Sequence, residues 1–99
     1  MKVFNNVIEM VGNTPMVKVT NMDTGPCELY LKLELQNPGG SIKDRIAVEM
    51  VEQAEKQGKL KPGDTIIEAT AGNTGLGLAL VAAGKGYPLK IVMPDKMSQ

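Results

Sequence analysis

The chain has 99 residues, of which 42% are apolar, so it forms one small domain or part of a larger protein. Eleven basic and eleven acidic residues are interspersed and give zero net charge, which argues against a nucleic-acid-binding surface. One cysteine, Cys27, and no histidine exclude an internal disulfide and disfavour a zinc site. Because the N-terminus has no signal-peptide core and no apolar run is long enough to span a membrane, we expect a cytoplasmic protein.

The first 35 residues predict a short helix followed by two strands. The helix is expected over residues 6–11 and should stop at Gly12. Residues 16–20 and 27–34 are β-rich, and the second segment alternates apolar and polar side chains. Two such strands, joined by a turn-rich segment, predict an antiparallel hairpin with one face in water.

A glycine-rich turn and a helix form the centre of the chain. Residues 37–40, Asn-Pro-Gly-Gly, have turn chemistry, and Ser41 can cap a helix with Asp44 completing a variant of the capping box. Apolar residues then recur at helical spacing and predict a helix over 42–57, with Gly58 just past its end. These apolar residues are Ile42, Ile46, Ala47, Met50, Val51 and Ala54.

Lys43 lies near the middle of the apolar half of this helix, so we expect its side chain to point inward. Burial and the positive helix N-terminus both disfavour the ammonium form, and thereby favour the neutral amine that a nucleophile or Schiff base requires. The alternative is a lysine at the helix edge whose ammonium group reaches water. The polar half of the helix is expected to hold Asp44, Arg45, Glu49, Glu52, Glu55 and Lys56.

Residues 65–93 have the pattern of a βαβ unit. Two β-rich runs, 65–69 and 89–93, flank a loop at 71–75 and an almost wholly apolar helix at 76–83, which Gly84 should close. The two strands should be parallel with a right-handed crossover, and the apolar helix must be covered on more than one side. The second half is therefore α/β and layered. Because residues 94–98 resemble the start of another helix, we expect the chain to be the N-terminal part of a longer protein.

The loop after the first of these strands is a candidate anion site. It lies at the carboxyl end of a strand and the start of a helix, where open α/β sheets bind ligands. Gly72, Gly75 and Gly77 expose backbone N–H groups there, and Thr70, Asn73 and Thr74 supply polar side chains. Either a phosphate or a carboxylate would suit this loop. The alternative is an ordinary turn in which Asn73 only caps the helix.

A nucleotide-binding module is a second possibility for the same loop. Residues 72–77 read G-x-x-G-x-G, the wrong order for the dinucleotide fingerprint, and starting at Gly75 leaves the third glycine missing. Asp95 does lie about 20 residues on, where a ribose-binding acid belongs. A Walker A pattern is absent from the sequence.

Three linked motifs resemble the cysteine synthase / cystathionine β-synthase family. They are I-E-M-V-G-N-T-P at 8–15, K-L-E at 32–34 with N-P-G-G-S-I-K-D-R at 37–45, and E-A-T-A-G-N-T-G-L-G at 68–77. The resemblance covers the whole chain in order. It implies the fold type II (tryptophan synthase β-like) architecture: a partial three-layer parallel-sheet α/β domain, preceded by two antiparallel strands.

The same resemblance implies roles for individual residues. Lys43 matches the family's Schiff-base lysine for pyridoxal 5'-phosphate and would be the catalytic residue, and Asn73 matches the asparagine that hydrogen-bonds the cofactor. The loop that grips the substrate α-carboxylate corresponds to Thr70, Ala71, Gly72, Asn73 and Thr74. The family usually has serine where this chain has Ala71, which removes one hydroxyl donor. Its phosphate-binding loop and the residue at the pyridine nitrogen would lie beyond residue 99.

By this resemblance, residues 1–35 would join a larger domain, and residues 36–99 would be the first part of a smaller one. The implied activity is β-replacement, which makes cysteine or cystathionine from O-acetylserine or serine and a sulfur nucleophile. The full-length protein would be a homodimer, whereas the 99 residues alone are expected to be inactive. A non-catalytic α/β fragment and the nucleotide-binding module remain as alternatives.

Overall fold

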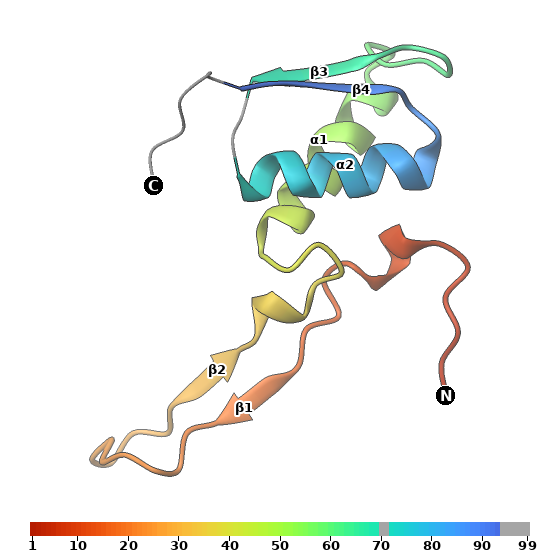
Figure 1. Ribbon diagram of the computed structural model, residues 1–99. Helices are drawn as coiled ribbons and strands as arrows, with labels where there is room; N and C mark the ends of the chain where they lie inside the picture. Colours follow the sequence, from red (N-terminus) through yellow and green to blue (C-terminus); the bar gives the residue numbers. More distant parts are fainter. Residues whose placement is uncertain (70–71, 94–99) are drawn as a thin grey trace.

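The structure is a computed structural model that describes residues 1–69 and 72–93. An N-terminal arm (residues 1–36) includes a two-stranded ribbon, and the remaining chain packs two crossed helices beneath a pair of strands (Figure 1). The expected helix start at 94–98 and Asp95 lie outside the described residues. In chain order the elements are η1 (Val7–Met10), β1 (Met16–Lys18), β2 (Tyr30–Lys32), η2 (Glu34–Gln36), α1 (Lys43–Lys56), β3 (Ile66–Ala69), α2 (Asn73–Lys85) and β4 (Leu89–Val92).

The N-terminal arm contains the predicted short helix and the predicted antiparallel pair. Asn6 caps η1 and Glu9 returns a bond to the Asn6 backbone, a complete capping box. In the ribbon, Met16 is paired with Lys32 and Lys18 with Tyr30. Both strands are shorter than predicted, and all of their residues are exposed. A ribbon of two strands has no second layer against which to bury a face.

The second half forms the predicted βαβ unit, so the α/β fold class is confirmed. β3 and β4 are parallel, with Ile66 beside Leu89 and Ala69 beside Val92, and α2 connects them. Side chains on one face of this pair are partly buried towards the helices. The other face keeps Ile67 64% and Val92 58% exposed, so helices cover one face only within the described part of the chain.

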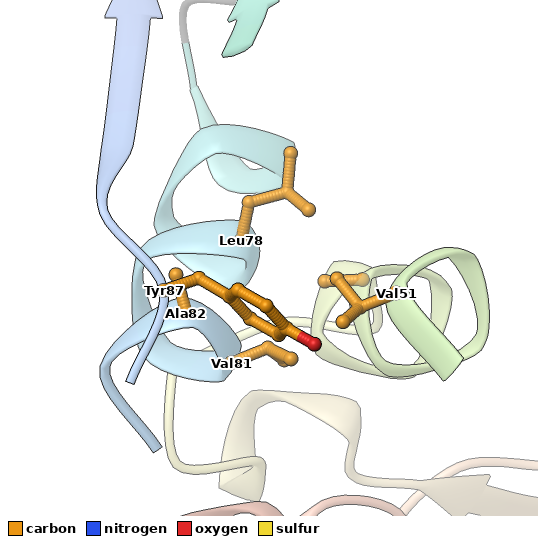
Figure 2. Close-up of a cluster of buried hydrophobic side chains, with 6 residues drawn as sticks. Val51, Leu78, Val81, Ala82 and Tyr87 are labelled. Carbon is orange, nitrogen blue, oxygen red and sulfur yellow. The ribbon is translucent and has the colours of Figure 1, made fainter. Parts of the chain in front are cut away.

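The core lies where α1 crosses α2 (Figure 2). The Tyr87 ring lies between α2 side chains and Val51 of α1, and its hydroxyl donates to Glu55 Oε2 at 2.6 Å. Small residues let the two helices approach closely: a Cβ at Gly77 would lie 2.9 Å from the Lys43 carbonyl oxygen. The buried apolar residues are Ala47, Val51, Leu78, Val81, Ala82 and Tyr87.

The predicted capping box at the start of α1 is wrong, because Ile42 rather than Ser41 occupies the cap position and no side chain caps the helix. Ser41 Oγ does accept a hydrogen bond, from the Lys43 N–H at 3.1 Å, and the helix begins at Lys43. The Asp44 carboxylate, however, turns to the glycine turn, where Oδ2 accepts the Gly39 N–H at 2.5 Å. At the other end Gly58 is confirmed as the residue past the helix, with φ +73° and its N–H bonded to Glu55 O.

The predicted bounds of the second helix, 76–83, are wrong at both ends. α2 begins at Asn73 and continues through Gly84 to Lys85, and Gly86, with φ +84°, closes it. Gly84 is needed inside the helix because the arm packs against it: a Cβ there would lie 2.8 Å from both Asn6 Oδ1 and Ile8 Cδ1. Asn6 Nδ2 also donates to the Gly84 carbonyl at 2.8 Å.

The predicted division of α1 into two faces needs a third correction. Asp44, expected on the polar face, is fully buried, whereas Ile42, Ile46 and Met50 are more than 40% exposed. The buried face is centred on Ala47 and Val51 because α2 packs there. Helical periodicity showed that α1 is amphipathic, but the position of its neighbour decided which side is covered.

Replacing Gly77 with valine is expected to destabilise the protein. The added Cβ would stand 2.9 Å from the Lys43 carbonyl oxygen and 3.2 Å from the Ala47 Cβ. Overpacking of this kind costs about 1–3 kcal/mol, which exceeds the gain of about 0.4 kcal/mol in helix propensity. Urea unfolding would measure the loss. Ala83→Val on the exposed side of α2 is the matched control, and an equal loss in both variants would contradict the close helix contact.

Candidate functional site

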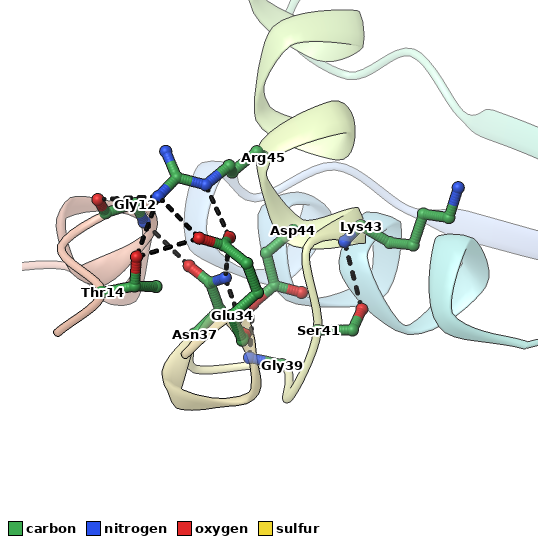
Figure 3. Close-up of polar contacts among 9 residues, drawn as sticks. All are labelled: Gly12, Thr14, Glu34, Asn37, Gly39, Ser41, Lys43, Asp44 and Arg45. Atoms are coloured by element: carbon green, nitrogen blue, oxygen red, sulfur yellow. Dashed lines mark hydrogen bonds and ion pairs between the residues drawn. The ribbon is translucent and has the colours of Figure 1, made fainter. Parts of the chain in front are cut away.

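Lys43 is the first residue of α1, and its side chain is partly buried. It extends away from the neighbouring Asp44 and Arg45 side chains, on the side where α2 begins (Figure 3). Within residues 1–69 and 72–93, its amine takes part in no hydrogen bond or ion pair. An amine that no carboxylate among the described residues engages is available to react with a ligand.

The start of α2 is the second part of the site. Gly72 precedes the helix with φ +145°, a backbone conformation that favours glycine, and Asn73 and Thr74 form its first turn. The first N–H groups of a helix have no partner within it, so they can bind an anion. Gly72 rather than Asn73 occupies the cap position of α2, so the cap that was expected in the alternative of an ordinary turn is not formed by Asn73. Thr70 and Ala71 lie outside the described residues.

Close packing places the starts of the two helices next to each other. The Lys43 backbone lies against Gly77, one turn into α2, so the lysine and residues 72–74 belong to one region of the fold. A hollow of about 360 Å³ opens beside this region, between the first turns of α2 and the end of β4. Lys43 does not line it; its lining residues are Gly72, Gly75, Leu76, Ala79, Ile91 and Met93.

An ion pair between Glu34 and Arg45 joins the arm to the first turn of α1 (Figure 3). Arg45 Nε donates to Glu34 Oε1 at 2.7 Å and Nη2 donates to Oε2 at 3.2 Å, a bidentate arrangement. Arg45 Nη2 also donates to the Gly12 carbonyl at 3.0 Å. The sequence pattern placed Arg45 on the polar side of the helix but did not identify these partners.

Two further side chains complete this cluster, which we call the Arg45 hub (Gly12, Thr14, Glu34, Asn37 and Arg45). Thr14 Oγ1 donates to Glu34 Oε2 at 2.9 Å, and Asn37 Nδ2 donates to Oε1 at 2.9 Å. Asn37 Oδ1 in turn accepts the Gly12 N–H at 2.8 Å. The hydrogen bond from Arg45 is the main cause that lowers the Glu34 pKa from 4.5 to about 2, and the bonds from Asn37 and Thr14 act in the same direction.

Asp44 is a buried group that sequence reasoning missed. It is 0% exposed, and within the described residues its Oδ1 has no hydrogen-bond partner. The carboxylate lies against Gly39, where an added Cβ would be 2.8 Å from Asp44 Cγ. The sequence signal that could have indicated this contact is the Gly39-Gly40 pair, which leaves room for a side chain folding back from the helix.

A second polar cluster fixes the other end of α1. Glu55 accepts from Lys85 Nζ at 2.9 Å and from the Tyr87 hydroxyl. The tyrosine bond, more than the lysine bond, lowers the Glu55 pKa, and the same contact raises the pKa of Tyr87. Helix α1 therefore has a polar anchor at each end, one to the arm and one to α2.

The sequence of residues 7–99 matches the family described as pyridoxal-phosphate dependent enzyme. The chain belongs to this family. Pyridoxal phosphate is the cofactor of the family, and the predicted resemblance to cysteine synthases and cystathionine β-synthases is confirmed.

Named members of the pyridoxal-phosphate-dependent family are close in sequence. A cysteine synthase of Staphylococcus aureus (strain Mu50 / ATCC 700699) is 56% identical over 99 residues, 99% of this chain and 32% of the relative. A cystathionine beta-synthase of Mus musculus is 55% identical over 100 residues, 98% of this chain and 18% of the relative.

Solved structures of the family have the same fold. A hydrogen sulfide-producing enzyme from Fusobacterium nucleatum superposes with a TM-score of 0.91 at 57% identity, covering 99% of this chain and 32% of that one. An O-acetyl serine sulfhydrylase from Entamoeba histolytica superposes with a TM-score of 0.88 at 44% identity, covering 98% of this chain and 30% of that one. The chain therefore spans about a third of the length of these two enzymes.

Two further features, a metal-binding cluster and a membrane-spanning helix, are absent from the described residues. Residues 1–69 and 72–93 contain no group of three or more histidine, cysteine, aspartate or glutamate side chains placed to hold a metal ion. No helix in the same ranges has the length and apolar character needed to cross a membrane.

The Glu34–Arg45 pair should make stability depend on pH. The Glu34 pKa is about 2 in the folded chain against an ordinary 4.5, so its stabilisation is complete above about pH 4.5 and is lost as the pH falls towards about 2. We expect urea unfolding to show Glu34→Gln less stable than the wild type near neutral pH, with the difference narrowing in acid. Glu52→Gln, at an exposed position of α1, should keep the wild-type pH dependence. A constant difference between Glu34→Gln and wild type from neutral pH to acid would contradict this account.

Proposed function

We propose that the protein at its natural length is a pyridoxal-phosphate-dependent β-replacement enzyme. The reaction would replace the β-substituent of O-acetylserine or serine with a sulfur nucleophile and yield cysteine or cystathionine. The observation that carries the proposal is the place of Lys43: an amine without an acidic partner among the described residues, at the start of α1 and beside the start of α2, in a chain of this family.

The chemistry of the described groups fits the cofactor. Lys43 supplies an amine that can hold the cofactor's aldehyde covalently, and Asn73 supplies an amide that can hydrogen-bond a ring oxygen. The N–H groups of Asn73, Thr74 and Gly75, at the start of α2, suit the α-carboxylate of an amino acid. Thr70 and Ala71 belong to the same proposed carboxylate loop.

Lys43 would have two tasks in the reaction. It first anchors the cofactor, and once the substrate's amine has displaced it, its freed amine accepts the proton from the substrate Cα. The cofactor, when bound, supplies an electron sink for the resulting negative charge. The short polar loop at the start of α2 holds the substrate by its carboxylate, so that the Cα–H bond stays close to Lys43.

The division into domains belongs to the same proposal. Residues 1–35 would join a larger domain, because their ribbon is exposed on all sides and two strands alone are marginally stable. Residues 36–99 would begin a smaller domain, whose sheet still exposes Ile67 and Val92. A homodimer and a cytoplasmic location stay as predictions.

Replacing Lys43 with alanine in the natural-length protein is expected to abolish the visible absorbance of the bound cofactor and to lower turnover at least about a hundredfold. Lys56→Ala, on an exposed position of the same helix, is the matched control and should retain both. The measurements are an absorbance scan with added pyridoxal phosphate, and product formation from O-acetylserine and sulfide. If Lys43→Ala keeps the parent's rate, the lysine has no part in the mechanism. A parent without visible absorbance would instead favour a nucleotide-binding or non-catalytic protein.

The 99 residues expressed alone are expected to turn over substrate near the rate of free cofactor in water. Lys43 could still react with the aldehyde, but by the family resemblance the phosphate-binding loop lies outside these 99 residues, and positioning supplies up to about 7–11 kcal/mol of a barrier. The comparison is between this chain and the natural-length protein, each with cofactor, an O-acylserine donor and a thiol. Equal rates would show that residues 1–99 contain all the groups that matter.

A further inference from the structure

The two side chains that follow Lys43 tie the first turn of α1 to two different segments earlier in the chain. Asp44 reaches back to the turn before the helix and accepts the Gly39 N–H. Arg45 reaches to the arm and pairs with Glu34, whose backbone lies 11 residues earlier. The Lys43 side chain, in contrast, extends towards the start of α2 (Figure 3).

The contact made by Arg45 is geometrically demanding. Its guanidinium group is a planar fork that meets both Glu34 oxygens and also the Gly12 carbonyl oxygen. Side chains of both partners are mostly covered, with 34% of Arg45 and 19% of Glu34 exposed. A lysine at position 45 would keep the charge but could not make the two parallel bonds, so the pair fixes orientation as well as distance.

The third restraint on Lys43 comes from α2. The Lys43 carbonyl oxygen lies so close to Gly77 that a Cβ added to Gly77 would stand 2.9 Å from this oxygen. A rotation of the first turn of α1 would therefore press the Lys43 carbonyl oxygen into α2 or break the Arg45 fork. The amine of Lys43 is presented from a backbone that is fixed on three sides.

We propose that Arg45, together with Glu34, is a positioning residue for Lys43. The pair holds the first turn of α1 at the angle from which the lysine amine meets its carbonyl ligand, and neither residue touches that ligand. This inference rests on the proposed function, because it assumes that Lys43 binds pyridoxal phosphate. The proposal gives Arg45, the last residue of the K-D-R motif at 43–45, a role of its own next to that of the lysine.

The opposite end of α1 supplies a matched control. Tyr87 donates to Glu55 at 2.6 Å and anchors the last turns of the same helix, far along the chain from Lys43. Tyr87→Phe removes this bond while keeping the buried ring. Arg45→Lys and Tyr87→Phe should therefore both lower the stability of the fold, but only Arg45→Lys should disturb the lysine.

The experiment uses the natural-length protein with pyridoxal phosphate and three readouts: the urea midpoint, the visible absorbance of the loaded protein, and the fraction of Lys43 trapped with the cofactor by borohydride, counted by peptide mass spectrometry. For Arg45→Lys we expect a weaker or shifted absorbance band, at least about a threefold loss of trapping, and at least about a tenfold fall in kcat with KM little changed. Tyr87→Phe should have a lower urea midpoint than the wild type but the same absorbance, the same trapped fraction and the same kcat.

A second variant keeps the test decisive if Arg45→Lys does not fold. Glu34→Gln retains one of the two accepting oxygens and the shape of the side chain but loses the charge and the second acceptor, so it should move the same readouts in the same direction. In the double variant the two effects should not add, because both remove one interaction. Trapping and absorbance at wild-type values in whichever of these variants folds would overturn the proposal.

Failure of the proposed function gives a different result. If wild-type protein shows no visible absorbance and no trapping on Lys43, the function is wrong, and a positioning role for Arg45 falls with it. If the wild type shows both and the Arg45 and Glu34 variants do as well, the function stands and the positioning role alone is wrong. Equal losses in Arg45→Lys and Tyr87→Phe would also overturn it, because they would assign the effect to general loosening of α1.

Discussion

The bidentate contact between Arg45 and Glu34 is the interaction on which the arrangement of this chain depends. Hydrogen bonds to charged groups are stronger than neutral ones, and this pair carries additional bonds to Gly12, Thr14 and Asn37. It connects the arm, through Gly12 and the short η2 segment, to α1. The ribbon beyond it has no buried residue of its own, so the arm is placed by this hub and by the contact of η1 with α2.

Close approach of the two helices is the second constraint, and it brings together the two segments of the proposed site. Ala47 and Gly77 are small enough for α1 and α2 to cross with their backbones nearly touching. This crossing places the first turn of α1, with Lys43, beside the first turns of α2. The amine proposed to react and the first N–H groups of α2 come from segments about 30 residues apart, and packing of small side chains brings these segments into one region.

The buried carboxylate of Asp44 illustrates how the site region departs from the rules that govern the rest of the chain. Burying a charge is unfavourable unless it is paired or hydrogen-bonded. Asp44 has one bond, from Gly39, and a second oxygen without a partner in the described part of the chain. Such departures concentrate where a protein positions functional groups, and here the residue lies directly beside Lys43.

The sequence by itself determined the local elements, the turn glycines and the family. Periodicity identified α1, the parallel β3–α2–β4 unit and the antiparallel ribbon, because these depend on residues near each other in the chain. Gly58 was also identified, since a helix end needs a left-handed residue. Three ordered motifs were sufficient to indicate the pyridoxal-phosphate-dependent family and, by resemblance, to propose Lys43 and Asn73 as site residues.

Only the tertiary structure decided which sides of these elements are covered. The apolar residues of α1 cover more of the helix surface than the stripe that is buried. Because α2 packs against Ala47 and Val51, these two are buried, whereas Ile42, Ile46 and Met50 stay exposed. Gly84 stays within α2 because Asn6 and Ile8, about 80 residues earlier, pack against it. The partners of Arg45, Glu34 and Gly12, likewise come from segments that are distant in the sequence. A periodic pattern contains the spacing of side chains along one element, but the partner of each side chain depends on distant segments that spacing does not encode.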